Sequence, residues 1–452
     1  MRGRSVAGAL ALSSLLLAAA CSSSGSSGGA TSAGAATAAG AAGAGKASSA
    51  PVANSDNNAW ALRYTGGSAG PAKGTPYKIG FVSQDTFLPS ATQGARAAVA
   101  YVDAELGGVG GRPIELVSCS VNVPEDAARC GAQMANDASL SLVVVGGLSV
   151  GNKEFYDAVG GRKAILIGNA LASEDFVTTR GVAYTAGSPG VLMGMARFAV
   201  EELKARTVAG IVPDTPAGRA AAQQLVKPIL DAAKVKFRPV FISLQATTPD
   251  LTTALQASGA ASADALITAF PPSSCISMYD AIRSLGIKPK VITTDQCADV
   301  PVRAHLKTIG APDAIPDGWY YANYGYNFDL PDVDSGMKTY QYAASKYAKP
   351  LGSAPVELRG FSGPTFGTVM TAAKIVNQLG VDKATSFDVV DRALRGFTGP
   401  AMLQVGPLKC GQAPFVAVCG HQIGVDQYTG GKWTSVRDGL NDKPVNLLAP
   451  VS

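Results

Sequence analysis

The chain has 452 residues, of which 47% are hydrophobic and 16% charged, with a formal net charge of +5 at pH 7. This length suits two or three domains with full cores. The basic residues are scattered, so the charge pattern argues against nucleic acid as a partner. The two histidines, His305 and His421, and the lack of a C-x-x-C pair indicate no metal site, and we expect no cofactor.

Residues 1–20 are typical of an export signal, with a positively charged start and an apolar stretch too short to span a bilayer stably. The small residues Ala18–Ala20 before Cys21 resemble the bacterial lipobox, in which the cysteine is lipidated. The alternative is an ordinary signal peptide that happens to precede a cysteine. Lipidation of Cys21 would anchor the mature chain, outside the cytoplasm, to the outer face of the cell membrane.

Residues 21–75 are rich in Ser, Gly and Ala, so we expect a flexible tether. Exported chains fold in an oxidising environment, which favours disulfides. Of seven cysteines, removing Cys21 leaves six. They fall in local pairs, and among the possible pairings we expect the nearest-neighbour pattern. The expected disulfides are Cys119–Cys130, Cys275–Cys297 and Cys410–Cys419.

From Tyr77 onward, β-type and α-type patterns alternate, separated by short glycine turns. Such alternation predicts right-handed βαβ units and a parallel sheet. The expected strands are 78–83, 114–118, 142–145 and 164–167, and the expected helices are 91–106, 124–137 and 155–159.

The same order of elements returns roughly 125 residues later, which indicates an internal duplication and two similar α/β lobes. The alternative is a chance likeness between generic βα units. The second series comprises strands 208–212, 239–243, 265–269 and 291–294, with helices 217–233, 249–257 and 276–285. After a further strand at 319–322, helices are expected at 332–346, 362–379 and 386–394, then strands at 402–405, 415–418 and 422–428.

The stretch Ser141–Gly151, SLVVVGGLSVG, is the most informative local pattern. A buried strand ends in a glycine turn that presents Ser149 and free backbone N–H groups, at the edge where α/β sheets bind ligands. The same letters match G-x-S-x-G, the pattern of a hydrolase nucleophile. The sequence alone therefore leaves two interpretations of Ser149, a residue of a ligand-binding site or a catalytic serine.

Several stretches together resemble the type I periplasmic (solute-binding) proteins, in particular the Leu/Ile/Val-binding lipoproteins of ABC importers. The resemblance runs from about Tyr77 to Trp433. It is carried by KIGFVS, QGARAAVAYVDAELGGVGGRPIELVSCS, VVVGGLSVG, KAILIGNALASEDF and GFTGPAMLQV. It implies an α/β fold of two Rossmann-like lobes with parallel sheets, joined by a three-strand hinge and closing on a small molecule.

The resemblance also implies the domain limits. They are a signal peptide at 1–20, a tether at 21–75, lobe 1 at 76–188, lobe 2 at 189–318, a return to lobe 1 at 319–400, and a return to lobe 2 with the C-terminal tail at 401–452.

The resemblance implies a set of ligand contacts. Ser149 with Val150 would hold a carboxylate, Asp295 in the second lobe would pair with an ammonium group, and the loop from Ala170 to Ala172 would offer polar contacts. Aromatic contacts would come from Phe270, Phe361 and Phe87. Two positions depart from the amino-acid pattern, because Ala172 replaces a threonine and Pro189 stands where an acid is usual.

We therefore predict a lipid-anchored, monomeric solute-binding protein that is not an enzyme. It would deliver an amino acid or a related amide or carboxylate to a membrane permease. Two alternatives stay open. One is an exported serine hydrolase using Ser149, an acid such as Asp295, and His421. The other is a ligand-sensing lipoprotein that acts through a protein partner.

Overall fold

The computed structural model describes residues 54–325, 327–331, 333–437 and 443–450. The expected signal peptide and the lipidation site Cys21 lie outside these residues. Among the described residues, no helix is both long enough and apolar enough to cross a membrane.

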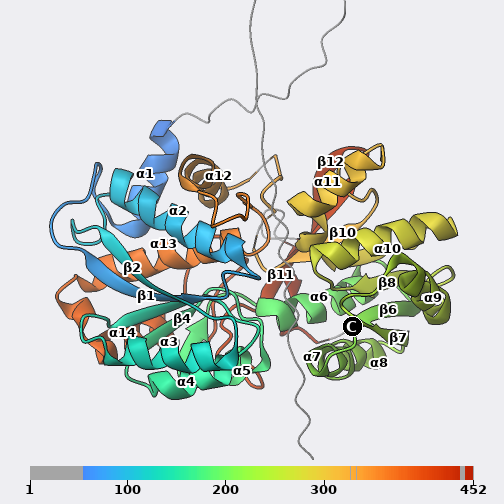
Figure 1. The fold of residues 1–452 in the computed structure, drawn as a ribbon, viewed down its shortest axis with the longest axis horizontal. Coiled ribbons are helices and arrows are strands. Elements are labelled where there is room, and N and C mark those ends of the chain that lie inside the picture. The colour runs from blue at the N-terminus through green and yellow to red at the C-terminus, as the bar shows by residue number, and fades with distance from the viewer. Residues whose placement is uncertain (1–53, 326, 332, 438–442, 451–452) are drawn as a thin grey trace, which may run out of the picture. The chain divides into compact units, whose positions relative to one another are not determined.

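The first lobe is built on a five-stranded parallel sheet with the order β2-β1-β3-β4-β5 (Figure 1). Its central strands are buried on both faces, as expected for a parallel sheet covered by helices. Leu142 and Val144 pack toward one layer of helices, and Val143 and Val145 pack toward the other. The strands are β1 (Tyr77–Ser83), β2 (Ile114–Ser120), β3 (Leu142–Gly147), β4 (Ala164–Ile167) and β5 (Gly181–Ala183).

The second lobe repeats this arrangement. Five parallel strands run in the order β7-β6-β8-β9-β10, and antiparallel β11 and β12 extend the sheet beyond β10. The matching strand order confirms the prediction of two similar α/β lobes. The strands are β6 (Thr207–Pro213), β7 (Lys236–Ile242), β8 (Ala265–Thr268), β9 (Val291–Thr294), β10 (Tyr320–Asn323), β11 (Gln422–Thr429), β12 (Lys432–Arg437) and β13 (Val445–Asn446).

Helices cover both faces of each sheet (Figure 1). The first lobe carries α1 (Asn54–Thr65), α2 (Pro89–Glu105), α3 (Pro124–Asn136), α4 (Asn152–Val159), α5 (Ser173–Val177), α12 (Ser335–Tyr347), α13 (Ser362–Leu379), η3 (Lys383–Thr385) and α14 (Phe387–Gly396). The second lobe carries α6 (Gly187–Glu201), α7 (Pro216–Ala220), the π-helix η1 (Ala221–Val226), α8 (Lys227–Ala232), α9 (Thr248–Ser258), α10 (Pro272–Leu285), the 3-10 helix η2 (Asp295–Ala298) and α11 (Val300–Thr308).

The structure corrects the expected limits of the tether. Residues 54–65, which were expected to be flexible, form α1 and pack against α12 and α13. Ala61 and Tyr64 are buried, and the Tyr64 hydroxyl bonds with that of Thr371 at 2.8 Å. The few large side chains in a small-residue stretch are therefore enough to dock a helix.

The returns between lobes also differ from the expected limits. Strand β10 pairs with β9 and belongs to the second sheet, so the return to the first lobe begins after Asn323. The strands expected at 402–405 and 415–418 do not form, and only single bridges such as Leu408↔Gly420 are present. Pro407 and Pro414 interrupt this region, and proline cannot donate a ladder hydrogen bond.

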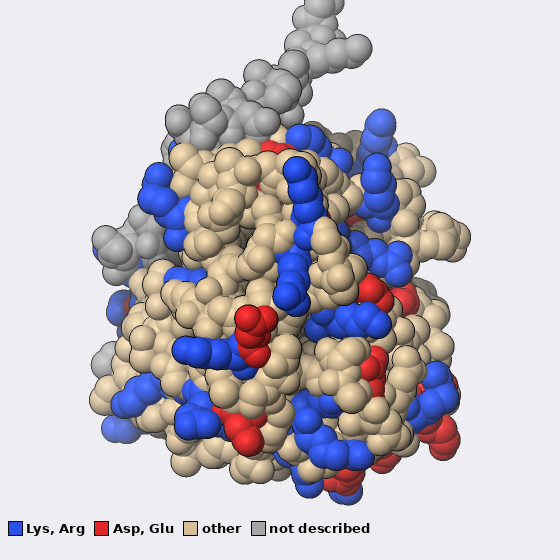
Figure 2. Space-filling view, turned by 90° about the vertical axis from the view of Figure 1, so that its left-hand side faces the viewer, with Lys and Arg blue, Asp and Glu red and all other residues tan. Residues whose placement is uncertain are grey.

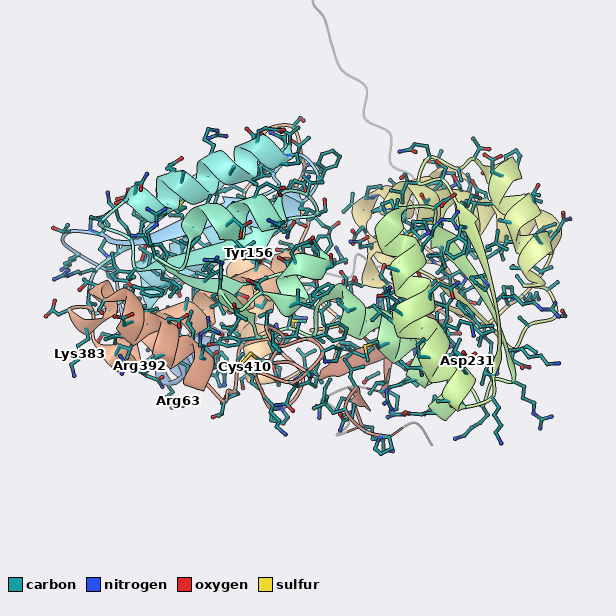
Figure 3. The ribbon with its side chains drawn as sticks, turned by 90° about the horizontal axis from the view of Figure 1, so that it is seen from below. Arg63, Tyr156, Asp231, Lys383, Arg392 and Cys410 are labelled. Carbon is teal, nitrogen blue, oxygen red and sulfur yellow. A yellow bond between two sulfur atoms is a disulfide. The ribbon has the colours of Figure 1, made fainter. Side chains whose placement is uncertain are left out.

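All three expected disulfides are present: Cys119–Cys130, Cys275–Cys297 and Cys410–Cys419, the last marked by Cys410 in Figure 3. On the face shown in Figure 2, Lys and Arg side chains are dispersed among acidic and uncharged ones without forming a continuous basic band.

Candidate functional site

The loops that follow the strands of both sheets line one cleft of about 1950 Å³. The first lobe contributes residues after β1, β3 and β4, and the second lobe contributes residues after every one of its parallel strands. The segment between α12 and α13 supplies a further side of the cleft, from Ala354 to Phe361. A parallel sheet presents its carboxyl ends to ligands, so the duplicated topology positions this site.

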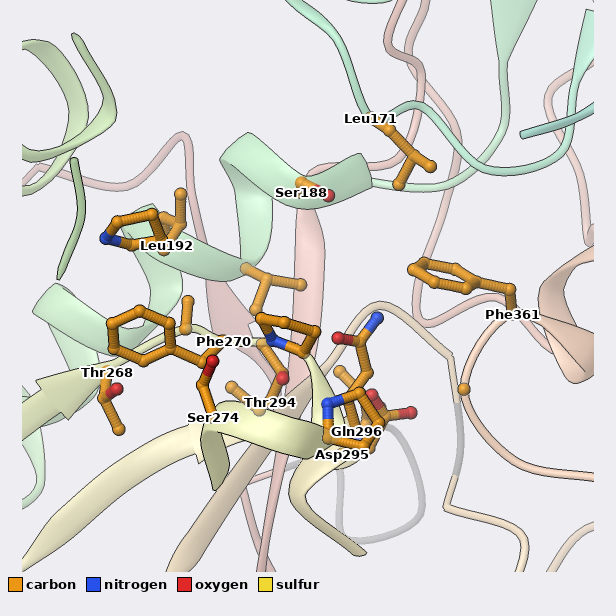
Figure 4. Close-up of a pocket in the computed structure, with 18 of the residues that line it drawn as sticks. Leu171, Ser188, Leu192, Thr268, Phe270, Ser274, Thr294, Asp295, Gln296 and Phe361 are labelled. Atoms are coloured by element: carbon orange, nitrogen blue, oxygen red, sulfur yellow. The ribbon is translucent and has the colours of Figure 1, made fainter. Parts of the chain in front are cut away.

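Five of the residues expected to contact a ligand line this cleft. Phe270 is 3% exposed and follows β8, whereas Phe361 enters from the other side, immediately before α13 (Figure 4). Asp295 opens η2 directly after β9. Phe87 and Ser149 lie on the first lobe, and Phe87 is 67% exposed.

Ser149 is already bonded within its own lobe. Its hydroxyl donates to Gln84 Oε1 at 2.6 Å, and its backbone N–H donates to the same oxygen at 3.1 Å. Gln84 itself is buried, with 2% of its surface exposed. The hydrogens that were expected to hold a carboxylate are therefore both engaged, and Ser149 Oγ is left with acceptor capacity.

Three residues expected to contact a ligand, Val150, Ala170 and Ala172, are not among the described residues that line the cleft. Val150 packs against the core between β3 and α4, and Ala170 is fully buried. The Ala170 carbonyl accepts from Ser188 N at 3.0 Å, and Ala172 N donates to Asp175 Oδ2 at 3.1 Å. These local bonds occupy the loop's polar groups.

Buried Asp175 fixes that loop. Its carboxylate accepts hydrogen bonds from Tyr156 OH at 2.5 Å, Asn152 Nδ2 at 2.8 Å and Leu171 N at 2.9 Å. The loop is therefore rigid, and it turns Leu171, rather than its neighbours, into the cleft (Figure 4).

Three carboxylates gather on the second-lobe side of the cleft. Burial, reinforced by the negative charge of Glu357, raises the pKa of Asp295 to about 7. Burial and the charges of Glu357 and Asp295 raise the pKa of Asp299 well above its ordinary range. Among the described residues, neither aspartate forms an ion pair. The pair is therefore poised to ionise when a positive charge arrives.

Two contacts link the lobes beside these acids. The Glu357 carboxylate accepts from Val300 N, in the first turn of α11, at 3.0 Å. Arg359 donates to both oxygens of Asp329, at 2.8 Å and 2.6 Å, and Arg303 of α11 also donates to Asp329, at 2.5 Å. The segment before α13 is thus bonded to the second lobe while Gln93 of α2 holds it to the first, through Pro355 O at 2.8 Å.

A third link lies deeper, at the hinge. Tyr324, just after β10, donates to Asn169 Oδ1 at 2.8 Å, and Asn169 follows β4 of the other lobe. Asn169 Nδ2 in turn donates to Gly146 O and to Thr365 of α13. This buried bond ties both lobes and the return helix together.

Sequence reasoning missed Gln84, Asp299, Glu357 and Arg359. Asp299 follows a predicted strand by only five residues and could have been included with Asp295. Glu357 and Arg359 lie in an irregular segment without periodicity, and Gln84 is not distinguishable from any polar residue after a strand. No sequence signal marks these three.

The hydrolase interpretation is wrong. The ring of His421 bonds Lys409 O through Nε2 at 2.8 Å, and His421 is not among the residues that line the cleft with Ser149. The Ser149 hydroxyl, whose proton a catalytic histidine would take, donates to Gln84 instead. Within the described residues there is also no cluster of His, Cys, Asp or Glu suited to a metal ion.

Comparisons with known proteins agree with the geometry. The profile of a family described as periplasmic binding protein matches residues 76–403. No curated protein matches the sequence. A leucine-binding protein from Thermotoga maritima shares the fold, with 13% identity and a TM-score of 0.60 over 80% of this chain and 98% of that chain.

Two further solved structures show the same fold with other ligand names. A fatty acid ABC transporter substrate-binding protein from Thermomonospora curvata is 17% identical, with a TM-score of 0.60 over 82% of this chain and 94% of that chain. A solute-binding protein of an ABC transporter from R. palustris, in complex with 4-hydroxybenzoate, is 15% identical, with a TM-score of 0.63 over 83% of this chain and 99% of that chain.

Proposed function

Because the chain belongs to the periplasmic binding protein family, we propose that it is the extracytoplasmic binding component of an ABC-type importer. It is a solute-binding protein and not an enzyme. The observation that carries the proposal is the single cleft between the carboxyl ends of two duplicated sheets. A two-lobed site of this kind encloses a ligand by rotation about the connecting strands and exposes a new surface to a partner.

The connections between the lobes support closure as the working step. The chain passes from one lobe to the other after β5, after β10 and before β11. Contacts near these passes, such as Tyr324 OH to Asn169 Oδ1, are few and specific. We propose that a ligand shifts the equilibrium toward the closed form, which a membrane permease then recognises.

We propose a small polar ligand of the amino-acid, amide or carboxylate type, with its amino group against Asp295. Phe270 and Phe361 would exclude water and strengthen that contact. Relatives named for leucine and for 4-hydroxybenzoate make this range of ligands reasonable. Ser149 would contribute its oxygen from the first lobe.

We further propose that Cys21 carries a lipid, so that residues before α1 tether the binding lobes to the outer face of the membrane. A Cys21→Ser chain expressed with its natural leader should appear in the soluble extracytoplasmic fraction. The unsubstituted chain should partition with membranes. Equal partitioning of both chains would contradict the anchor without affecting the binding proposal.

The test of the binding function is a thermal-shift screen of the full-length chain against amino acids, amides, amines and carboxylates. A ligand that binds only the folded state should raise the melting temperature in a saturable way. The shift should be lost in Phe270→Ala and kept in Asp388→Asn, since Asp388 is exposed on α14, away from the cleft. No response to any small molecule, together with stoichiometric capture of one protein, would favour the alternative of a lipoprotein that acts through a protein partner.

A further inference from the structure

We infer that the cleft selects an organic cation, an amine with an apolar body, whose ammonium group lies against Asp295 and Asp299. This inference rests on the proposed function for the cleft and its closure, keeps the amino group against Asp295, and replaces the ligand class given there by amines. The inferred ligand differs from an amino acid or a carboxylic acid in having no carboxylate, so the cleft needs no group that binds one.

The charges in the cleft are the first argument. Among the described residues that line the cleft, the Asp, Glu, Lys, Arg and His residues are Asp295, Asp299, Glu357 and Arg359. Three carboxylates thus face one guanidinium, and no lysine is present. A carboxylate ligand entering this space would oppose the ionisation of Asp295 and Asp299, whereas an ammonium group would favour their ionisation and be attracted.

The single cation does not serve as a carboxylate anchor. Arg359 forms a bidentate pair of hydrogen bonds with Asp329, and its Nη1 donates to Glu357 Oε1 at 3.4 Å. A guanidinium held in this way has few donors left for a ligand. Ser149, the other expected anchor for a carboxylate, gives both its hydroxyl hydrogen and its N–H to Gln84.

Unpartnered atoms give an independent second argument. The buried polar atoms of the cleft lining that lack a hydrogen-bond partner are four oxygens and one nitrogen: Thr268 Oγ1, Thr294 Oγ1, Asp299 Oδ1, Asn323 Oδ1 and Asn327 Nδ2. Thr268 is 2% exposed and Asn323 is 6% exposed. Buried polar groups without partners are costly. Asp299 Oδ1 and Asn323 Oδ1 can accept a hydrogen bond, and the two threonine hydroxyls can accept as well as donate. An ammonium group, with three donors, is the complement of such a wall.

The location of these atoms is also specific. Thr268, Thr294 and Asn323 are the last residues of three adjacent strands, β8, β9 and β10. Asp299 lies across from the first lobe, since a Cβ built on Gly360 would be 3.6 Å from Asp299 Oδ2. The acceptors therefore span the second-lobe wall up to the segment that carries Phe361.

Apolar side chains supply the place for the body of the ligand. Phe270 and Leu192 lie on one side of the acids, and Leu171 and Phe361 lie on the other (Figure 4). Aromatic faces also attract ammonium groups directly. The inferred ligand is thus an alkyl or aryl amine, with its charge toward η2 and its carbon skeleton between the phenylalanines.

The test uses probes that share one skeleton and differ in charge. They are 2-phenylethylammonium, 2-phenylethanol, phenylalanine and 3-phenylpropanoate, with hexylammonium and heptanoate as an aliphatic pair. Calorimetry of the full-length chain at pH 8 should give an affinity for each ammonium at least tenfold above that for its matched carboxylate. Tighter binding of the carboxylate or of phenylalanine would overturn the inference.

Variants connect the preference to named residues. Asp299→Asn should weaken 2-phenylethylammonium binding about tenfold or more, because an amide cannot ionise when the ammonium group arrives. The same variant should leave 2-phenylethanol binding within a factor of two. Asp388→Asn should change neither affinity. An Asp299→Asn chain that keeps full affinity for the cation would contradict the inference.

The pH dependence of the affinity tests the carboxylate contact directly, because a purely apolar contact would not change with pH. Asp295 is faced by Asp299, Glu357 and Tyr324, with Arg359 and Arg303 beyond Asp299. Below a pH of about 7 it carries a proton, so the affinity for 2-phenylethylammonium should fall about tenfold for each further pH unit. An affinity independent of pH between 5 and 8 would count against the carboxylate contact.

A last measurement covers the case in which no probe binds. Small molecules retained by the natively purified chain can be released with acid and identified by mass spectrometry. An amine supports the inference, whereas a carboxylic acid overturns it and leaves the proposed binding function intact. Recovery of no small molecule, together with no binding of any probe, overturns both.

Discussion

Glu105, at the end of α2, holds three helices together and should lose that role in acid. Its carboxylate accepts hydrogen bonds from Asn58 Nδ2 at 2.6 Å, Tyr347 OH at 2.7 Å, Tyr342 OH at 2.8 Å and Lys346 Nζ at 2.9 Å. Its side chain is only 11% exposed. The four donors come from α1 and α12, so this one carboxylate fastens the N-terminal helix to the first lobe.

The contribution of Glu105 to the folding free energy follows from the shift in its pKa. Burial alone would raise the pKa of Glu105, but the hydrogen bonds from Lys346, Asn58 and the two tyrosines outweigh burial and lower it from 4.5 to about 2. That difference corresponds to about 3 kcal/mol of folding free energy. Because the pKa is depressed in the folded state, this stabilisation is complete above about pH 4.5 and disappears as the pH falls toward 2.

The assay is urea denaturation of the full-length chain and of Glu105→Gln at pH 7 and again near pH 2.5. The variant should lose about 3 kcal/mol of unfolding free energy at pH 7 and much less in acid. Glu115→Gln is the control, because Glu115 is 48% exposed and 3.8 Å from Lys78, and it should change stability by under about 0.5 kcal/mol. An equal loss at both pH values would refute the reasoning.

Three other predictions concern the hinge and the packing. Tyr324→Phe removes the bond to Asn169 and should lower the unfolding free energy by about 1 kcal/mol, with a changed open-to-closed ratio in small-angle scattering. Gly94→Ala places a Cβ 2.2 Å from a backbone carbonyl oxygen of α13 and should cost roughly 1–3 kcal/mol in denaturation experiments. Replacing both Cys275 and Cys297 by serine should cost about 3 kcal/mol, and it should reduce the stability difference between oxidised and reduced protein to the part contributed by the other two disulfides.

The fold was largely predictable from the sequence. Glycine turns between short β-branched runs identified the parallel strands, and the repeat identified the two lobes. The failures have physical causes. The helix α1 ends a stretch whose overall composition is typical of a tether, and it is stabilised by contacts with α12 and α13 that the sequence does not reveal. The region around Pro407 and Pro414 has strand-like side chains but cannot complete a ladder.

The site was predictable only where it follows the ends of strands. Phe270 and Asp295 lie at fixed offsets after β8 and β9, so the topology alone brings them to one cleft. The family resemblance implied Ala172, which also follows a strand, as a contact, but the buried carboxylate of Asp175 accepts hydrogen bonds from the loop's N–H groups. A position after a strand gives the neighbourhood of a residue, whereas local hydrogen bonds decide which atoms stay free.

The duplicated lobes use the same position in opposite ways. After β4 of the first lobe, every polar group of the Asn169 side chain is bonded, to Gly146, Thr365 and Tyr324, and the position serves the hinge. After the equivalent β9, Asp295 forms no ion pair among the described residues, and Thr294 Oγ1 has no partner. Among the described residues that line the cleft, the buried polar atoms without partners lie on the second lobe or just after β10. We therefore expect ligand affinity to depend mainly on second-lobe substitutions, and closure to depend mainly on the bonds around Asn169.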